Sequence, residues 1–169
     1  MISLAEAVKL KSILQSKYRE LIAERSRVAF VLVEKGTEAK REGRTVVVVE
    51  QELEQVRNDI RTLDRLVYEA NVQNTVSFNG EQLTLVEAIE LAKQLRLEVS
   101  EMKLLANSEK EEVQYGYGEG VTLIRVALFE PEQYRIHSEK LERQAHKLSN
   151  LVNAKNYQVQ IDFDDSNYM

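Results

Sequence analysis

Residues 83–107 contain the pattern that most restricts the fold, because apolar residues recur there at alternating steps of three and four positions. Such spacing places them on one face of an α-helix and predicts a seam that packs against a partner helix over about three heptads. Thr84 and Glu87 form a capping box at its start, in which a hydroxyl and a carboxylate bond the first free amides. The helix should be roughly 35 Å long. The seam consists of Leu85, Ala88, Ala92, Leu95, Val99, Met102 and Ala106.

Three further segments are typical of long helices. A second capping box, Ser3 with Glu6, predicts a helix that extends to about Arg25. Residues 51–72 repeat the apolar seam, and the last helix is expected over residues 131–155, where proline occupies the first turn. A charged fraction of 30% and a single proline also favour long solvated helices. The sequence therefore predicts a mainly α fold, a bundle of four long helices with antiparallel coiled-coil-like packing.

Small β elements are expected between the helices. Residues 28–33 and 44–49 are rich in β-branched side chains, which favours two short antiparallel strands joined by a charged loop. Extension of the flanking helices into these residues is the alternative, because short apolar runs are ambiguous by period. Asn79-Gly80 predicts a tight β-hairpin turn, since both positions need positive φ. Further strands are expected at residues 121–128 and 159–163.

Length and composition limit the class of protein. The 169 residues suit a single helical domain over residues 1–169, with a mobile loop at 107–120 and a frayed tail at 164–169. The net charge is −5, and basic residues alternate with acidic ones, which argues against nucleic acid as a partner. The chain has no cysteine, no apparent signal peptide and no apolar run near the ~20 residues of a membrane helix. We therefore expect a cytoplasmic protein that does not bind membranes.

The search for catalytic or metal-binding residues gives only a weak candidate. Glu142 and His146 are four positions apart on one predicted helix and could be two ligands of a metal ion. A ferritin-like site would need a glutamate where Arg143 stands, so a solvent-facing pair is the favoured interpretation. No Ser/His/Asp set has supporting context. We predict no catalytic residues, no metal and no cofactor.

Four residues near helix ends form a candidate structural or partner site: Asn71, Asn74, Asn156 and Tyr157. The side-chain amides of the three asparagines could bind a neighbouring chain. Capping of helix carbonyls and turn formation is the alternative, and it is the favoured one.

Several short motifs occur in an order that resembles a family of small bacterial helical proteins, some of which carry the label septicolysin. These motifs are Leu4-Ala5-Glu6-Ala7, the pair Asn71 and Asn74, Leu83-Thr84, Glu87-Ala88 and Asn156-Tyr157. The resemblance implies a homo-oligomer and brings no established reaction.

Together these observations predict a homo-oligomeric helical protein with a structural or interaction role. The copies should associate through the helical seams and through segments 28–33 and 44–49, since exposed β-prone segments need cover. A further protein partner is compatible with this hypothesis. The alternative function is a metal-dependent hydrolase whose carboxylates meet at a subunit interface.

Overall fold

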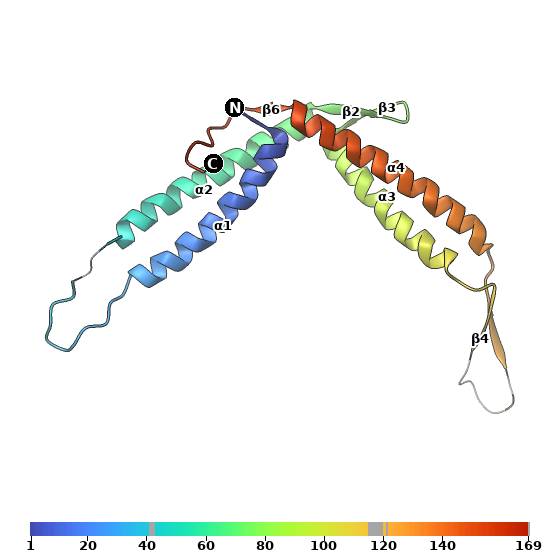
Figure 1. Cartoon of the computed structure of the whole chain (residues 1–169), viewed down its shortest axis with the longest axis horizontal. Coiled ribbons are helices and arrows are strands. Elements are labelled where there is room, and N and C mark those ends of the chain that lie inside the picture. The colour runs from blue at the N-terminus through green and yellow to red at the C-terminus, as the bar shows by residue number, and fades with distance from the viewer. Residues whose placement is uncertain (41–42, 115–119, 121, 169) are drawn as a thin grey trace. The chain divides into compact units, whose positions relative to one another are not determined.

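The computed structural model describes residues 1–40, 43–114, 120 and 122–168. In these residues the fold is mainly α, with four helices and three antiparallel pairs of short strands (Figure 1). The prediction of a mainly α protein with small β elements is confirmed. The elements in chain order are β1 (Ile2–Ser3), α1 (Leu4–Val28), α2 (Val46–Gln73), β2 (Thr75–Phe78), β3 (Glu81–Thr84), α3 (Leu85–Ala106), β4 (Glu111–Gln114), β5 (Leu123–Val126), α4 (Pro131–Gln158) and β6 (Gln160–Ile161).

The contacts within the chain gather in two compact units, whereas the sequence suggested one domain. The first unit consists of Met1–Asn74 with Lys155–Met169, and the second unit is Thr75–Ala154. Each unit contains one pair of long helices, α1 with α2 in the first and α3 with most of α4 in the second.

In the first unit, α1 and α2 lie side by side in opposite directions (Figure 1). The predicted capping box starts α1: the Ser3 amide donates to the Glu6 carboxylate at 2.7 Å, and the Glu6 amide donates to the Ser3 hydroxyl at 3.2 Å. Strand β1 pairs with β6, so both ends of the chain are fixed to this unit. Leucines at helical spacing are fully buried between the helices, and each contributes about 1.5–3 kcal/mol by leaving water. They include Leu10, Leu14, Leu53 and Leu63.

The two strands predicted at residues 28–33 and 44–49 are not formed. Helix α1 ends at Val28, the following residues have no regular structure, and Val46 to Val49 begin α2. The alternative interpretation, in which a flanking helix extends into these residues, is correct for Val46 to Val49. Thr45 is the N-cap, and its hydroxyl accepts from the Val48 amide at 3.4 Å. This cap and the complete burial of Val49 outweigh the weak helix propensity of valine.

In the second unit, the hairpin predicted at Asn79-Gly80 is confirmed. Strands β2 and β3 pair with Phe78 opposite Glu81, and the two turn residues have φ of 53° and 90°. Glycine accepts this conformation without strain because it has no Cβ. The chain passes directly from β3 into α3, whose capping box joins Thr84 and Glu87 as predicted.

Helices α3 and α4 lie beside each other in the second unit (Figure 1). Polar contacts connect them: Arg96 donates to Ser149 at 2.6 Å, and Lys103 pairs with Glu142 at 2.9 Å. The predicted seam of α3 faces inward, since four of its members are buried and the others are partly buried. The buried ones are Leu85, Ala88, Ala92 and Val99.

The predicted loop at 107–120 contains a strand. This strand, β4, pairs with β5, which lies after the predicted loop, and Glu112 lies opposite Arg125 across the two strands. The cross-strand partner supplies the hydrogen bonds that local sequence could not reveal. Strand β5 falls inside the predicted strand 121–128. Residues 115–119 of the predicted loop, and residue 121, are outside the described residues.

The tail that was predicted to fray at 164–169 is ordered up to Tyr168. The Tyr168 ring packs against a buried cluster of α1 and α2, and its hydroxyl bonds the Asp59 carboxylate. Lys17 places its ammonium 5.0 Å from the ring centre. Burial, together with the Asp59 carboxylate, raises the pKa of the Tyr168 hydroxyl. Contacts with distant helices therefore order the tail, and residue 169 is outside the described residues.

Candidate functional site

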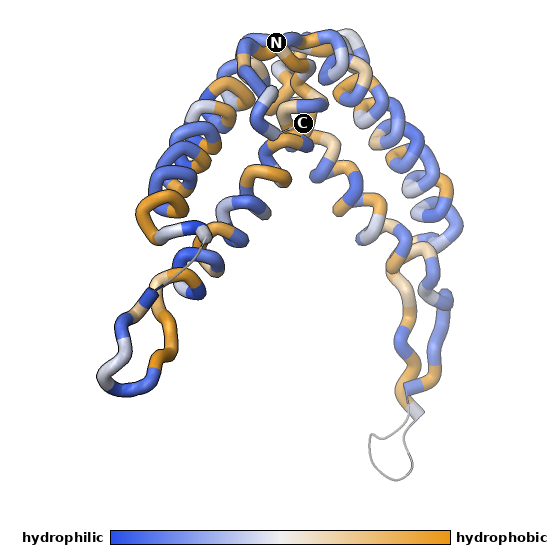
Figure 2. The backbone as a smooth tube through the Cα atoms, turned by 60° about the vertical axis from the view of Figure 1, so that its left-hand side comes forward, coloured by the Kyte–Doolittle hydropathy of each residue, from blue (hydrophilic) through white to orange (hydrophobic). Residues whose placement is uncertain are grey.

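The surface feature that most requires explanation is a group of exposed apolar side chains in the first unit. Four of them lie in the connection from α1 to α2 and two lie in the first turn of α2. We name them the apolar tip: Phe30, Val31, Leu32, Val33, Val47 and Val48. Leu32 is 101% exposed and Phe30 is 83% exposed. Hydrophobic residues follow one another along this connection in Figure 2. Contiguous exposed apolar residues of this kind mark interaction surfaces.

The second unit has an exposed apolar group of its own, on the β4–β5 hairpin and the residues after it. Leu128 is 97% exposed, and the others are between 42% and 54% exposed. A two-stranded hairpin has no second layer to cover its faces, so its apolar side chains stay in water. The other members are Val113, Leu123, Ile124 and Val126.

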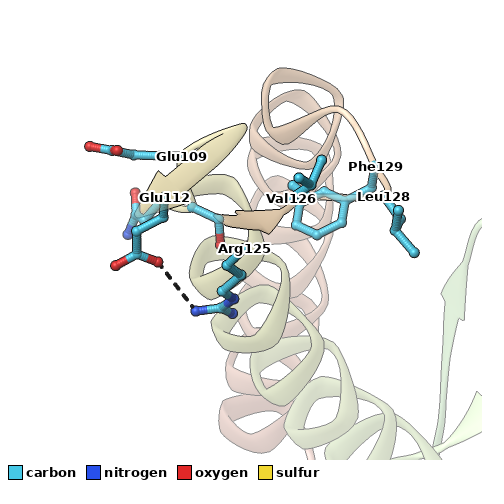
Figure 3. A pocket seen from close by; sticks show the side chains of 9 residues that line it. Glu109, Glu112, Arg125, Val126, Leu128 and Phe129 are labelled. Carbon is cyan, nitrogen blue, oxygen red and sulfur yellow. Dashed lines mark ion pairs between the residues drawn. The ribbon is translucent and has the colours of Figure 1, made fainter. Parts of the chain in front are cut away.

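A cavity of about 670 Å³ lies at the base of this hairpin (Figure 3). Glu112 reaches toward Arg125, and their charged groups are 3.6 Å apart. The apolar part of the lining comes from Val126, Leu128 and Phe129. The cavity thus combines one ion pair with an apolar wall, an arrangement that suits binding.

The chain between β5 and α4 is fixed by Lys110. Its ammonium donates to the Phe129 carbonyl at 2.9 Å and to the Glu130 carboxylate at 2.5 Å. The Lys110 carbonyl accepts from the Ala127 amide at 2.9 Å. The Phe129 ring meets Tyr134 edge to face at 5.0 Å. These contacts hold one wall of the cavity in position.

The metal candidates Glu142 and His146 line a second cavity, of about 540 Å³, along α3 and α4. We name it the α3–α4 groove. The Glu142 carboxylate accepts from Lys103, and this hydrogen bond is the main cause that lowers the pKa of Glu142, with a smaller contribution from His146. In the described part of the chain, no three or more His, Asp or Glu side chains gather closely enough to hold a metal ion. The structure therefore places Glu142 in an ion pair.

The four residues near helix ends all lie in the first unit. Asn74 is the C-cap of α2, and both its amide and its side chain donate to the Ala70 carbonyl, at 3.1 and 2.9 Å. The Asn156 side-chain oxygen is buried without a hydrogen-bond partner in the described residues, whereas Tyr157 is 63% exposed. Asn71 is half-buried in the last turn of α2. Capping, the favoured interpretation, holds for Asn74.

Sequence reasoning found the apolar tip in part and missed the two cavities. The apolar run at 28–33 was the signal for the tip, because it demanded cover of some kind. The α3–α4 groove depends on contacts such as Arg96 with Ser149, which are 53 positions apart, so no local pattern could indicate it.

The elements described above define a mainly α protein with helix pairs and small β-hairpins. Its fold is similar to the crystal structure of a functionally unknown conserved protein from Corynebacterium diphtheriae, with a TM-score of 0.64 and 21% sequence identity. The similarity covers 95% of this chain and 99% of that one, and at this identity it shows the fold alone. No family model and no curated protein matches the chain. Within the described residues, no helix is long and apolar enough to cross a membrane.

Proposed function

We propose that this protein is a homo-oligomeric helical interaction protein whose copies associate through the apolar tip. The observation that carries the proposal is the exposure of Leu32 together with its apolar neighbours. The sequence pattern predicted self-association through the helical seams and through segments 28–33 and 44–49, which include these residues. Although the strands expected there are not formed, the side chains that need cover remain in water.

The energetics support a contact of moderate strength. Two apolar tips present twelve side chains, and burial of half of them would contribute on the order of 10 kcal/mol, at about 1.5–3 kcal/mol for each fully buried side chain. Association costs about 4–15 kcal/mol in lost translational and rotational freedom. The two terms are of similar size, so additional helical contacts have to supply the surplus. We expect dissociation on the order of micromolar concentrations.

Light scattering after size-exclusion chromatography tests the proposal on the full chain. Between about 1 and 300 μM, a range that brackets micromolar dissociation, the mass should rise from one subunit toward two or more. Leu32→Asp should keep the protein monomeric over this range, because the contact would bury an unpaired carboxylate. Leu97→Asp is the matched control, since Leu97 is 65% exposed on α3 in the second unit. A monomer at every concentration, or an unchanged mass for Leu32→Asp, contradicts the proposal.

The alternative function, a metal-dependent hydrolase with carboxylates at a subunit interface, has no specific observation in its favour. Glu142 would have to leave Lys103 before it could bind a cation. Elemental analysis of the purified protein tests this alternative directly. A stoichiometric metal ion that stays bound through purification would favour the hydrolase over the interaction protein.

A further inference from the structure

We propose that the α3–α4 groove binds a small anionic ligand through a phosphate or carboxylate group. The groove lies within the second unit and has a volume of about 540 Å³, within the range of small-molecule sites. The inference does not depend on self-association, because none of the groove residues belongs to the apolar tip.

Arg96 is the residue that carries the inference. Its guanidinium donates to the Ser149 hydroxyl on α4 at 2.6 Å, and that hydroxyl donates in turn to the Ala145 carbonyl at 2.8 Å. The guanidinium has five N–H donors, and the hydroxyl accepts one of them. Among the ion pairs that the described residues form, none joins Arg96 to a carboxylate. Its remaining donors are therefore available to an anion.

Several arginines on the helices of this protein are paired with glutamates. Arg65 contacts Glu69, and Arg135 contacts both Glu132 and Glu139. Arg96 instead bonds a hydroxyl of the facing helix, and the ion pairs of the described residues do not include it. The guanidinium is thus oriented by a neutral partner that leaves its charge uncompensated.

The charge balance of the groove favours an anion over a cation. Lys103 and Glu142 neutralise each other in their ion pair, so Arg96 leaves a net positive charge in a chain whose formal charge is −5. His146, the other ionisable side chain of the lining, adds no negative charge. Side-chain amides of Asn150 and Asn153 add further N–H donors along α4.

Small and apolar side chains form the floor of the groove and leave space for a ligand. Val99 and Ala145 are buried beneath the polar residues, and the small side chains of Ala145 and Ser149 leave room above α4. A planar guanidinium can bind phosphate or carboxylate with two parallel hydrogen bonds, which fixes the orientation of the ligand. Because the groove is open to solvent, we expect dissociation constants between about 10 μM and 1 mM.

Calorimetric titration at low ionic strength, with inorganic phosphate, citrate and AMP as probes and adenosine as the neutral control, tests the inference. At least one anionic probe should bind the wild-type protein, and adenosine should not. Phosphate and AMP binding without citrate binding would assign the site to phosphate groups, and the reverse pattern would assign it to carboxylates. Binding of adenosine as tightly as AMP would overturn the inference, because the charge would then play no part.

Substitutions in and outside the groove test where the anion binds. Arg96→Gln should weaken binding at least tenfold, whereas Arg143→Gln, which removes an exposed arginine of α4 outside the groove lining, should leave it unchanged. Asn150→Asp adds a negative charge to an exposed position of the groove and should weaken binding without affecting the core. Circular dichroism verifies that each variant is folded. The absence of binding by all anionic probes, or equal affinities for Arg96→Gln and Arg143→Gln, would overturn the inference.

Discussion

Docking of the C-terminal tail can be tested at Tyr168. Tyr168→Phe keeps the ring on the α1–α2 cluster and removes the hydroxyl that bonds Asp59. A hydrogen bond to a charged acceptor contributes about 1.5–3 kcal/mol when buried, and partial exposure reduces this to about 1 kcal/mol here. Tyr168→Ala also removes the packing of the ring, so we expect a total loss of about 2 kcal/mol for a half-buried aromatic side chain.

The pH dependence of this effect has a definite sign. Burial raises the pKa of Tyr168 in the folded state above its unfolded value near 10, so the neutral phenol is favoured by folding. The stabilisation is therefore complete below about pH 10 and decreases as the pH rises toward the folded-state pKa. The free-energy difference between wild type and Tyr168→Phe should become smaller above pH 10.

Urea unfolding followed by circular dichroism measures both effects, at pH 7, 9 and 10.5. Comparison of the two proteins at each pH cancels the titration of the remaining tyrosines and lysines. Equal stability of wild type and Tyr168→Ala at pH 7 would refute the docking of the tail. A wild-type advantage over Tyr168→Phe that grows above pH 10 would refute the stated cause of the pKa shift.

Two further predictions concern the helices of each unit. Leu14→Ala should lower the free energy of unfolding by about 3 kcal/mol because Leu14 is fully buried, whereas Ile13→Ala, at an exposed neighbouring position, should change it by less than about 0.5 kcal/mol. Equal losses in chemical denaturation would contradict the described face of α1. Thr84→Ala should cost about 1 kcal/mol by removing the N-cap of α3. The Thr84 hydroxyl and amide lower the pKa of Glu87, so this part of the stability is present above the unfolded pKa and is lost as the pH falls through the folded one. The wild-type advantage over Thr84→Ala should therefore shrink in acid, and an advantage independent of pH from 7 to 3 would exclude the capping box.

Local patterns predicted the parts of the fold that local interactions determine. The seam and capping box at 83–107 correspond to α3 at Leu85–Ala106, and Asn79-Gly80 forms the expected turn. The valines before residue 50 were ambiguous because β-branched side chains favour strands, while burial of Val49 depends on α1. Tyr168 was misjudged for the same reason, since its partner Asp59 is 109 positions away.

The same difference between local patterns and long-range contacts separates the candidate sites. The apolar run at 28–33 could be recognised from composition, and its residues 30–33 are exposed in the connection between two helices. The α3–α4 groove could not, because Arg96 and Ser149 become neighbours only when α3 and α4 pack. On sequence alone, Glu142 and His146 had the spacing of metal ligands, but Lys103 on the other helix occupies the carboxylate.

The central claim, association through the apolar tip, is tested most directly by the distance between the tips of two copies. The chain has no cysteine, so Lys35→Cys introduces a single site for a spin label beside the apolar tip. Pulsed dipolar spectroscopy of this labelled protein should give a defined inter-subunit distance, and addition of Leu32→Asp should abolish it. An oligomer that shows no dipolar coupling at this position, or a coupling that survives Leu32→Asp, would contradict the account.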